Sequence, residues 1–142
     1  MNTQILHPMI VHFPIALVVV GFLADTISIF IKKELCLSKV GFYLMVLGTL
    51  GAIAAVITGS FFTQKVEGAA LPLKETHELF ANITMYILIA ASAIRVFLVA
   101  KKKENNSLKW VVYFLFLCAV ITITITGYKG GSIVYDVWLF GN

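Results

Sequence analysis

Four long runs almost free of charged residues constrain the fold of this 142-residue chain more than any other feature. Each run is about 20 residues long, the length that a helix needs to cross a bilayer core. They predict an all-α membrane protein, a four-transmembrane-helix bundle with these spans: about 9–31, 40–62, 78–100 and 109–128. Residues 129–142 form a C-terminal segment that starts with a turn at Lys129–Gly131, and residues 1–142 make one domain.

The composition agrees with this fold class. Hydrophobic residues make up 60% of the chain and charged residues 13%, whereas soluble domains carry about a quarter charged residues. A soluble enzyme domain, a disordered chain and a disulfide-rich secreted module are therefore excluded. Two cysteines without a C-x-x-C motif also exclude a thiolate zinc cluster and covalent haem attachment. No nucleophile–base pair or phosphate loop is visible, so we expect an electron-transfer or accessory protein rather than an independent enzyme.

The lysines predict the orientation in the membrane. The first and third connections contain seven of them, and the second connection and the tail contain three. By the positive-inside rule the first and third connections are cytoplasmic, and both termini lie on the outer side. The basic residues thus indicate the membrane topology, and the lipid bilayer is the expected partner. The sequence contains no basic patch interleaved with aromatic residues, so we expect no binding to nucleic acid.

Small residues in the second span predict a packing face. Gly51, Ala55 and Gly59 recur at every fourth position, and Gly48 lies on an adjoining stripe. Such small-xxx-small faces let another helix backbone approach closely.

Two charged residues lie within the predicted spans. Asp25 is seven residues before Lys32, and Arg95 is six before Lys101, so both lie about 9–10 Å from the cytoplasmic boundary. An unpaired charge costs about 2.5–3.5 kcal/mol at a helix centre. We therefore predict a structural ion pair between Asp25 and Arg95.

The three histidines, His7, His12 and His77, all lie at the opposite, outer end. His7 precedes Asp25 by 18 residues and His77 precedes Arg95 by 18, which is five full helical turns. If Asp25 meets Arg95, His7 therefore faces His77. A kink at Pro14 would instead bring His12 to His77.

Converging histidines indicate a cofactor or metal site. Two imidazoles on facing helices suit the axial ligation of a b-type haem, with the small-residue face of the second span against the porphyrin. A zinc or copper ion held by His7, His12 and His77, with Glu78 or Asp136, is an alternative. A third reading makes the histidines polar helix ends that bind nothing.

Five features in this order resemble a known family. They are the opening HPMIVHFPIAL, an Asp late in the first span, a Gly/Ala-rich second span ending in Thr-Gly, a third span opening with His and a final Gly-Gly-x-x-Val-Tyr. It is the bacterial predicted-membrane-protein family called domain of unknown function 2231, and the resemblance covers essentially the whole chain. The matching positions are His7, Pro8, His12, Pro14, Asp25, Thr58, Gly59, His77, Gly130, Gly131 and Tyr135.

The resemblance implies a small four-helix protein of the bacterial inner (cytoplasmic) membrane with a haem-linked role in electron transport. Family members often continue Val-Tyr-x-His-Gly, whereas this chain has Asp136 and Val137 after Tyr135. If that missing histidine pairs with one in the first span, at most one haem remains. We expect haem b as cofactor and a quinol or a larger respiratory membrane complex as partner, with a homo-oligomer left open. The alternative function is a cofactor-free structural or assembly subunit of a membrane complex.

Overall fold

The computed structural model describes residues 6–31, 35–62, 71–102 and 106–135, and nearly all of them are helical. The helices are α1 (Leu6–Phe30), α2 (Leu35–Phe62), α3 (Leu71–Ala100) and α4 (Asn106–Ser132). Each is long and apolar enough to cross a membrane. The predicted all-α fold with four spans is therefore confirmed.

All four helices begin three to seven residues before the predicted spans, because a helix continues into the polar ends that a hydropathy pattern leaves out. The largest difference concerns the predicted turn at Lys129–Gly131, which is wrong. α4 runs through these residues to Ser132, and residues 133–135 add a π-helical turn. Glycine weakens a helix by about 1 kcal/mol, a local preference that tertiary packing overrides. The remaining residues of the predicted tail, 136–142, lie outside the described part of the chain.

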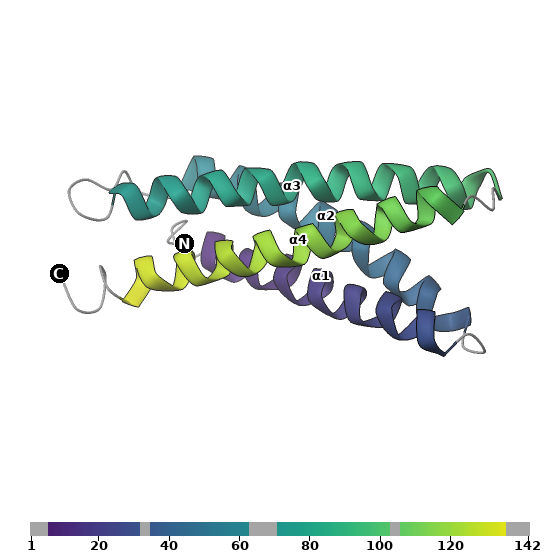
Figure 1. Ribbon diagram of the computed structural model, residues 1–142. Coiled ribbons are helices and arrows are strands. Elements are labelled where there is room, and N and C mark those ends of the chain that lie inside the picture. The colour runs from purple at the N-terminus through teal and green to yellow at the C-terminus, as the bar shows by residue number, and fades with distance from the viewer. Residues whose placement is uncertain (1–5, 32–34, 63–70, 103–105, 136–142) are drawn as a thin grey trace.

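The four helices form two antiparallel hairpins, α1–α2 and α3–α4, that pack across each other (Figure 1). α1 begins and α4 ends at the same end of the bundle, where α2 ends and α3 begins (Figure 1). We call this the histidine end because it contains His7 and His77, and we call the other the arginine end because Arg95 lies toward it. All three histidines thus lie toward one end of the bundle and the charged pair lies toward the other, as the sequence predicts.

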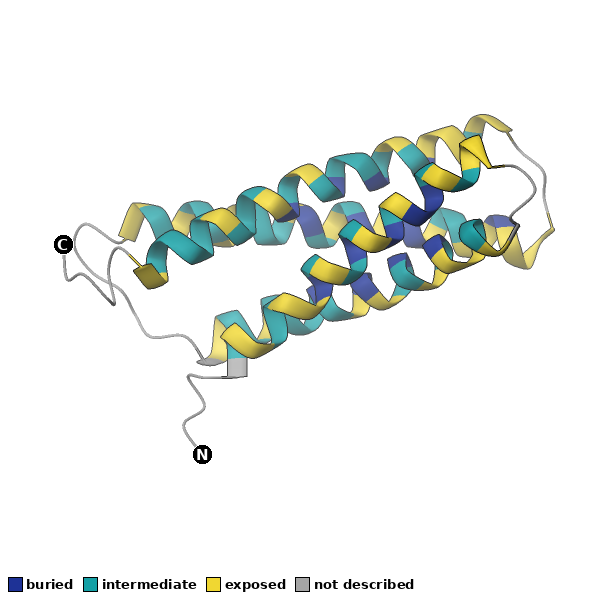
Figure 2. Ribbon diagram, turned by 90° about the horizontal axis from the view of Figure 1, so that it is seen from below, coloured by how far each residue is buried: buried dark blue, intermediate teal, exposed yellow. Residues whose placement is uncertain are grey.

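An apolar core fills the centre between the hairpins. Phe116, the largest fully buried side chain, packs edge-on against Phe22 of α1 with ring centres 5.7 Å apart. A buried hydroxyl pair, Thr49 and Ser92, links α2 to α3 with 2.7 Å between the oxygens. Exposed residues lie along the outer helix faces (Figure 2). Many of them are large and apolar, as lipid contact requires. The core comprises Val18, Met45, Ala52, Leu88, Ala91, Val112, Phe116, Ala119 and Ile123.

Glycines bring α2 close to α1. A Cβ atom added at Gly48 would lie 2.8 Å from Val18, and one added at Gly51 would lie 3.3 Å from Pro14. Gly41, which the predicted packing face does not include, is equally tight because its Cβ would lie 3.0 Å from the carbonyl oxygen of Gly21. The small-residue face of α2 therefore packs against α1 and continues two further turns toward the arginine end.

Candidate functional site

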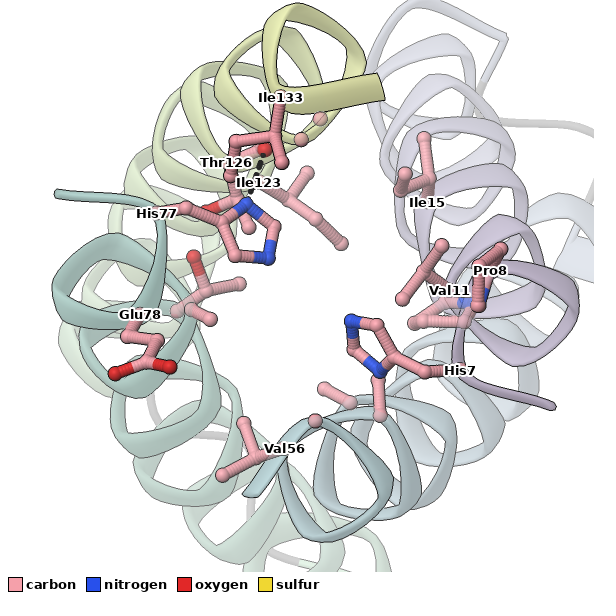
Figure 3. A pocket seen from close by; sticks show the side chains of 18 of the residues that line it. His7, Pro8, Val11, Ile15, Val56, His77, Glu78, Ile123, Thr126 and Ile133 are labelled. Carbon is pink, nitrogen blue, oxygen red and sulfur yellow. Dashed lines mark hydrogen bonds between the residues drawn. The ribbon is translucent and has the colours of Figure 1, made fainter. Parts of the chain in front are cut away.

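A cavity of about 510 Å³ opens between the four helices at the histidine end. Its walls are mainly apolar, and His7 of α1 and His77 of α3 both point into it (Figure 3). Ligand sites in proteins commonly have volumes of about 300–1,000 Å³ and apolar walls with a few polar groups. The cavity therefore has the size and lining of a small-molecule site. Its apolar walls include Val11, Ile15, Ala52, Val56 and Ile123.

His7 and His77 face each other across this cavity. Their ring centres are 6.3 Å apart and the ring planes are perpendicular. The two residues come from α1 and α3, which lie diagonally opposite in the bundle (Figure 3). The 18-residue spacing to Asp25 and Arg95 predicts this pairing, and the structure brings the two rings together.

The imidazole of His77 is oriented by the backbone of α4. Its Nδ1–H donates to the carbonyl oxygen of Thr126 at 2.9 Å. In a neutral imidazole with a protonated Nδ1, the other nitrogen, Nε2, carries the lone pair. This arrangement leaves Nε2 as the nitrogen that can bind a ligand in the cavity.

The imidazole of His7 has the same arrangement, with a side-chain acceptor. Its Nδ1 lies 3.3 Å from Thr58 Oγ1. The Thr58 hydroxyl donates to the carbonyl oxygens of Ala54 and Ala55, so its oxygen accepts the Nδ1–H of His7. Both rings are therefore held through Nδ1, as metal-ligating histidines typically are.

Two glycines make room for the two rings. A Cβ atom at Gly59 would lie 3.0 Å from Cε1 of His7, and one at Gly130 would lie 3.1 Å from Cε1 of His77. These distances are shorter than ordinary carbon–carbon contacts of about 3.5–4.0 Å. Any larger residue would push the ring out of its present position.

His12 does not join the pair. Its Nδ1–H donates to the carbonyl oxygen of Pro8 at 2.7 Å, and the side chain is exposed at the edge of the cavity. α1 runs continuously through the buried Pro14, and it is His7 that meets His77. The rephasing considered from the sequence does not occur.

The predicted cluster of three metal-binding histidines is also not assembled. Among the described residues, no three His, Cys, Asp or Glu side chains are grouped so that they could hold a metal ion. Glu78 lines the cavity, but it pairs with Lys74 at 3.6 Å. Asp136, the other carboxylate considered, lies outside the described residues.

Asp25 and Arg95 meet toward the arginine end. The guanidinium donates twice, from Nη1 to Oδ2 and from Nη2 to Oδ1, each at 2.8 Å. Nη2 also donates to Ser38 Oγ at 3.0 Å. Asp25 is buried, so this bidentate geometry compensates two charges that would be costly alone.

The histidines, the ion pair and the small residues were all found from the sequence, but three supporting residues were not assigned their contacts. Thr58 and Gly130 appear only as positions of the family resemblance, and their neighbours His7 and His77 are 51 and 53 residues away in the chain. Ser38 has no sequence signal, since its contact with Arg95 depends on how α2 enters the bundle.

Comparison with known proteins gives a family. No curated protein and no solved structure matches the chain. Residues 3–139, nearly the whole sequence, match the family described as predicted membrane protein (DUF2231). The match includes every helix and both histidines of the cavity. The chain therefore belongs to the DUF2231 family of predicted membrane proteins, as its opening motif suggests.

Proposed function

We propose that His7 and His77 are the axial ligands of one b-type haem, and that the protein transfers single electrons within the membrane. The observation that supports this most strongly is the His7–His77 pair, with both Nδ1 atoms engaged and both rings directed into one cavity. A haem bound there would supply one-electron chemistry. The protein would supply the two nitrogens, an apolar enclosure and control of ring orientation.

The spacing of the two rings fits this role. A metal ion lies about 2 Å from each imidazole nitrogen, and each ring centre lies about 1 Å beyond its nitrogen. Two imidazoles in line across one ion therefore have centres about 6 Å apart. The ring centres of His7 and His77 are 6.3 Å apart, which matches this value without movement of α1 toward α3.

The lining of the cavity also fits a flat apolar ring system with acidic substituents. Ala52 and Ala55 of α2 and Gly127 of α4 leave space between the two hairpins. Lys74, which pairs with Glu78, contributes a cation at the same end, near which the carboxylates of a haem would lie. The apolar walls favour the uncharged part of the macrocycle. The ammonium group favours the carboxylates at its edge, which would be in contact with water.

The lysines support a position for the site in the membrane. Their distribution supports an outer location for the histidine end, with both chain ends on that side and the arginine end facing the cytoplasm of a bacterial inner membrane. A haem at this level would exchange electrons with a quinol in the outer leaflet or with a neighbouring membrane complex. Such a protein acts as an electron carrier, and the same chain without cofactor would be a structural subunit.

Titration of purified apoprotein with haemin tests the proposal. We expect saturation at one haem per chain, with the absorption spectrum of a haem bound by two nitrogens. His7→Ala and His77→Ala should each weaken binding by at least tenfold, because one of the two axial ligands is lost. His12→Ala is the matched control, since this exposed histidine lies on the same helix as His7 but is not part of the pair.

Two outcomes would reject the haem assignment. Saturable binding of Zn²⁺ or Cu²⁺ that depends on His7 and His77, without haem binding, would assign the pair to a metal ion. Absence of both haem and metal binding in a folded protein would leave the structural subunit as the function.

A further inference from the structure

A second cavity, of about 640 Å³, lies at the arginine end of the bundle. All four helices contribute to its lining, and it lies toward the end where the two hairpins diverge in Figure 1. Its position, at the opposite end from the histidines, makes it a separate site. Nothing in the proposed electron transfer requires it.

Cations converge on this cavity from three helices. Lys39 extends from α2, Arg95 from α3 and Lys109 from α4, and Lys102 lies in the turn that follows α3. Among the described residues of the lining, Asp25 is the only carboxylate, and both of its oxygens accept hydrogen bonds from Arg95. The described residues of the lining thus carry four cations and one carboxylate, a formal charge of +3. Such an excess of one sign attracts a ligand of the opposite sign.

The polar groups of the lining suit an oxyanion. Lysine ammonium groups and serine hydroxyls donate hydrogen bonds to phosphate oxygens, and the charged donors make the stronger bonds. Ser28 and Ser38 lie in the lining together with the cations, and Ser38 is already oriented by Arg95. Arg95 is held by Asp25 and Ser38, while Lys39, Lys102 and Lys109 lie nearer the helix ends.

Aromatic residues in the lining favour a position of this cavity at the level of lipid headgroups. Trp110 and Tyr113 line it with ring centres 5.7 Å apart. Tryptophan and tyrosine concentrate at membrane interfaces, and basic pockets between transmembrane helices on the cytoplasmic side bind acidic lipid headgroups. The lysine distribution assigns this end to the cytoplasmic side.

We propose that this cavity is a binding site for the phosphate group of an anionic ligand, with Lys39, Lys102 and Lys109 as the recognising cations. The phosphate belongs either to the headgroup of an anionic lipid or to a soluble phosphate compound. A lipid is the source that reaches the cavity directly, from the leaflet in which the divergent helix ends lie.

The test measures ligand binding to the purified full-length protein in a neutral detergent. The probes are phosphatidylglycerol, phosphatidylcholine and inorganic phosphate, and bound lipid is counted by native mass spectrometry alongside the thermal unfolding midpoint. Lys39→Gln, Lys102→Gln and Lys109→Gln should each weaken phosphatidylglycerol binding by about fivefold. Lys101→Gln is the matched control, because this exposed lysine adjoins Lys102 but does not line the cavity. It should change binding by less than about twofold.

The outcomes distinguish the two possible sources of the phosphate and also test whether the cavity binds phosphate at all. Preference for phosphatidylglycerol over phosphatidylcholine, lost in the three cavity variants, supports a lipid site. Protection by inorganic phosphate alone, lost in the same variants, supports a soluble phosphate ligand. Equal weakening by Lys101→Gln, or equal binding of the two lipids, overturns the proposal, because the lysines then act only as general surface charge. Unfolding midpoints without ligand show that each variant remains folded.

Discussion

Gly130 and His77 are in direct contact across the interface between α4 and α3. The Cβ position of Gly130 lies 3.1 Å from Cε1 and 3.3 Å from Nδ1 of the imidazole. The ring can donate to the carbonyl oxygen of Thr126 only because the residue one turn further along α4 has no side chain. This contact requires a glycine at position 130, within a helix that runs on to Ser132.

Gly130→Ala should therefore displace the His77 ring. If haem binds as proposed, its dissociation constant should rise by about tenfold, the lower end of the range for disturbing groups around a ligand. Haemin titration measures the change. Gly131→Ala is the comparison: this residue also lines the cavity, but no atom lies within 4 Å of its Cβ position, and the gain in helix propensity is the same. Equal effects of the two substitutions would contradict the role assigned to Gly130.

Thr58→Val should weaken the site from the side of α1. It removes the hydroxyl oxygen that accepts the Nδ1–H of His7 while it keeps the shape of the side chain. Loss of such a supporting group typically costs about 10- to 100-fold in metal affinity, and we expect a similar loss of haem affinity. Thr124→Val removes a hydroxyl that donates only to the carbonyl oxygen of Val120, and it should leave affinity unchanged. A Thr58→Val protein with wild-type affinity would show that Thr58 does not orient the ring.

The ion pair between Asp25 and Arg95 should be strongly coupled in stability. Asp25→Asn and Arg95→Gln should each lower the free energy of unfolding by about 3 kcal/mol, because each leaves one charge buried without its partner. The double substitution should cost less than the sum of the two. Unfolding in mixed micelles measures the stability of the wild type, the two single variants and the double variant.

The Lys74–Glu78 pair on α3 provides a comparison for this cycle. Its atoms are 3.6 Å apart, and Glu78 is exposed, so we expect a coupling below about 0.5 kcal/mol. Additive costs at Asp25 and Arg95 would mean that the two residues do not stabilise each other.

Gly41→Ala should separate the first hairpin near that ion pair. The added Cβ would meet the carbonyl oxygen of Gly21 and the Cβ of Asp25, both at 3.0 Å. Backbone cannot move aside as a flexible side chain does, so we expect a loss of about 1–3 kcal/mol in stability. Gly127→Ala, whose Cβ would have only an ordinary 3.4 Å contact with Ile15, should cost less than 1 kcal/mol. A Gly41→Ala protein as stable as the Gly127→Ala protein would show that the seam can relax.

Periodicity made most of the site predictable from the sequence. Four apolar runs determine four helices, and equal depths paired Asp25 with Arg95. A separation of 18 residues then aligned His7 with His77 on the same faces of α1 and α3, since the helices are regular over those five turns. The choice between His7 and His12 depended on the path of α1 at Pro14, which spacing alone does not determine.

Other features lay beyond the reach of sequence patterns. Gly130 and Gly131 indicate a turn by local preference, whereas in the structure α4 continues through them and Gly130 makes room for His77. The contact of Ser38 with Arg95 joins residues 57 positions apart, and it arises from the crossing of the two hairpins. The exact helix ends also depend on polar residues outside the bilayer core, to which hydropathy is insensitive.

The reduced-minus-oxidised difference spectrum of protein purified from haem-supplemented cells tests the central assignment most directly. We predict one haem per chain with the Soret and split visible bands of a haem bound by two histidines. These bands should be retained in His12→Ala and lost in His7→Ala and His77→Ala. A folded wild-type protein without a Soret band, or His77→Ala with its full haem content, would contradict the assignment.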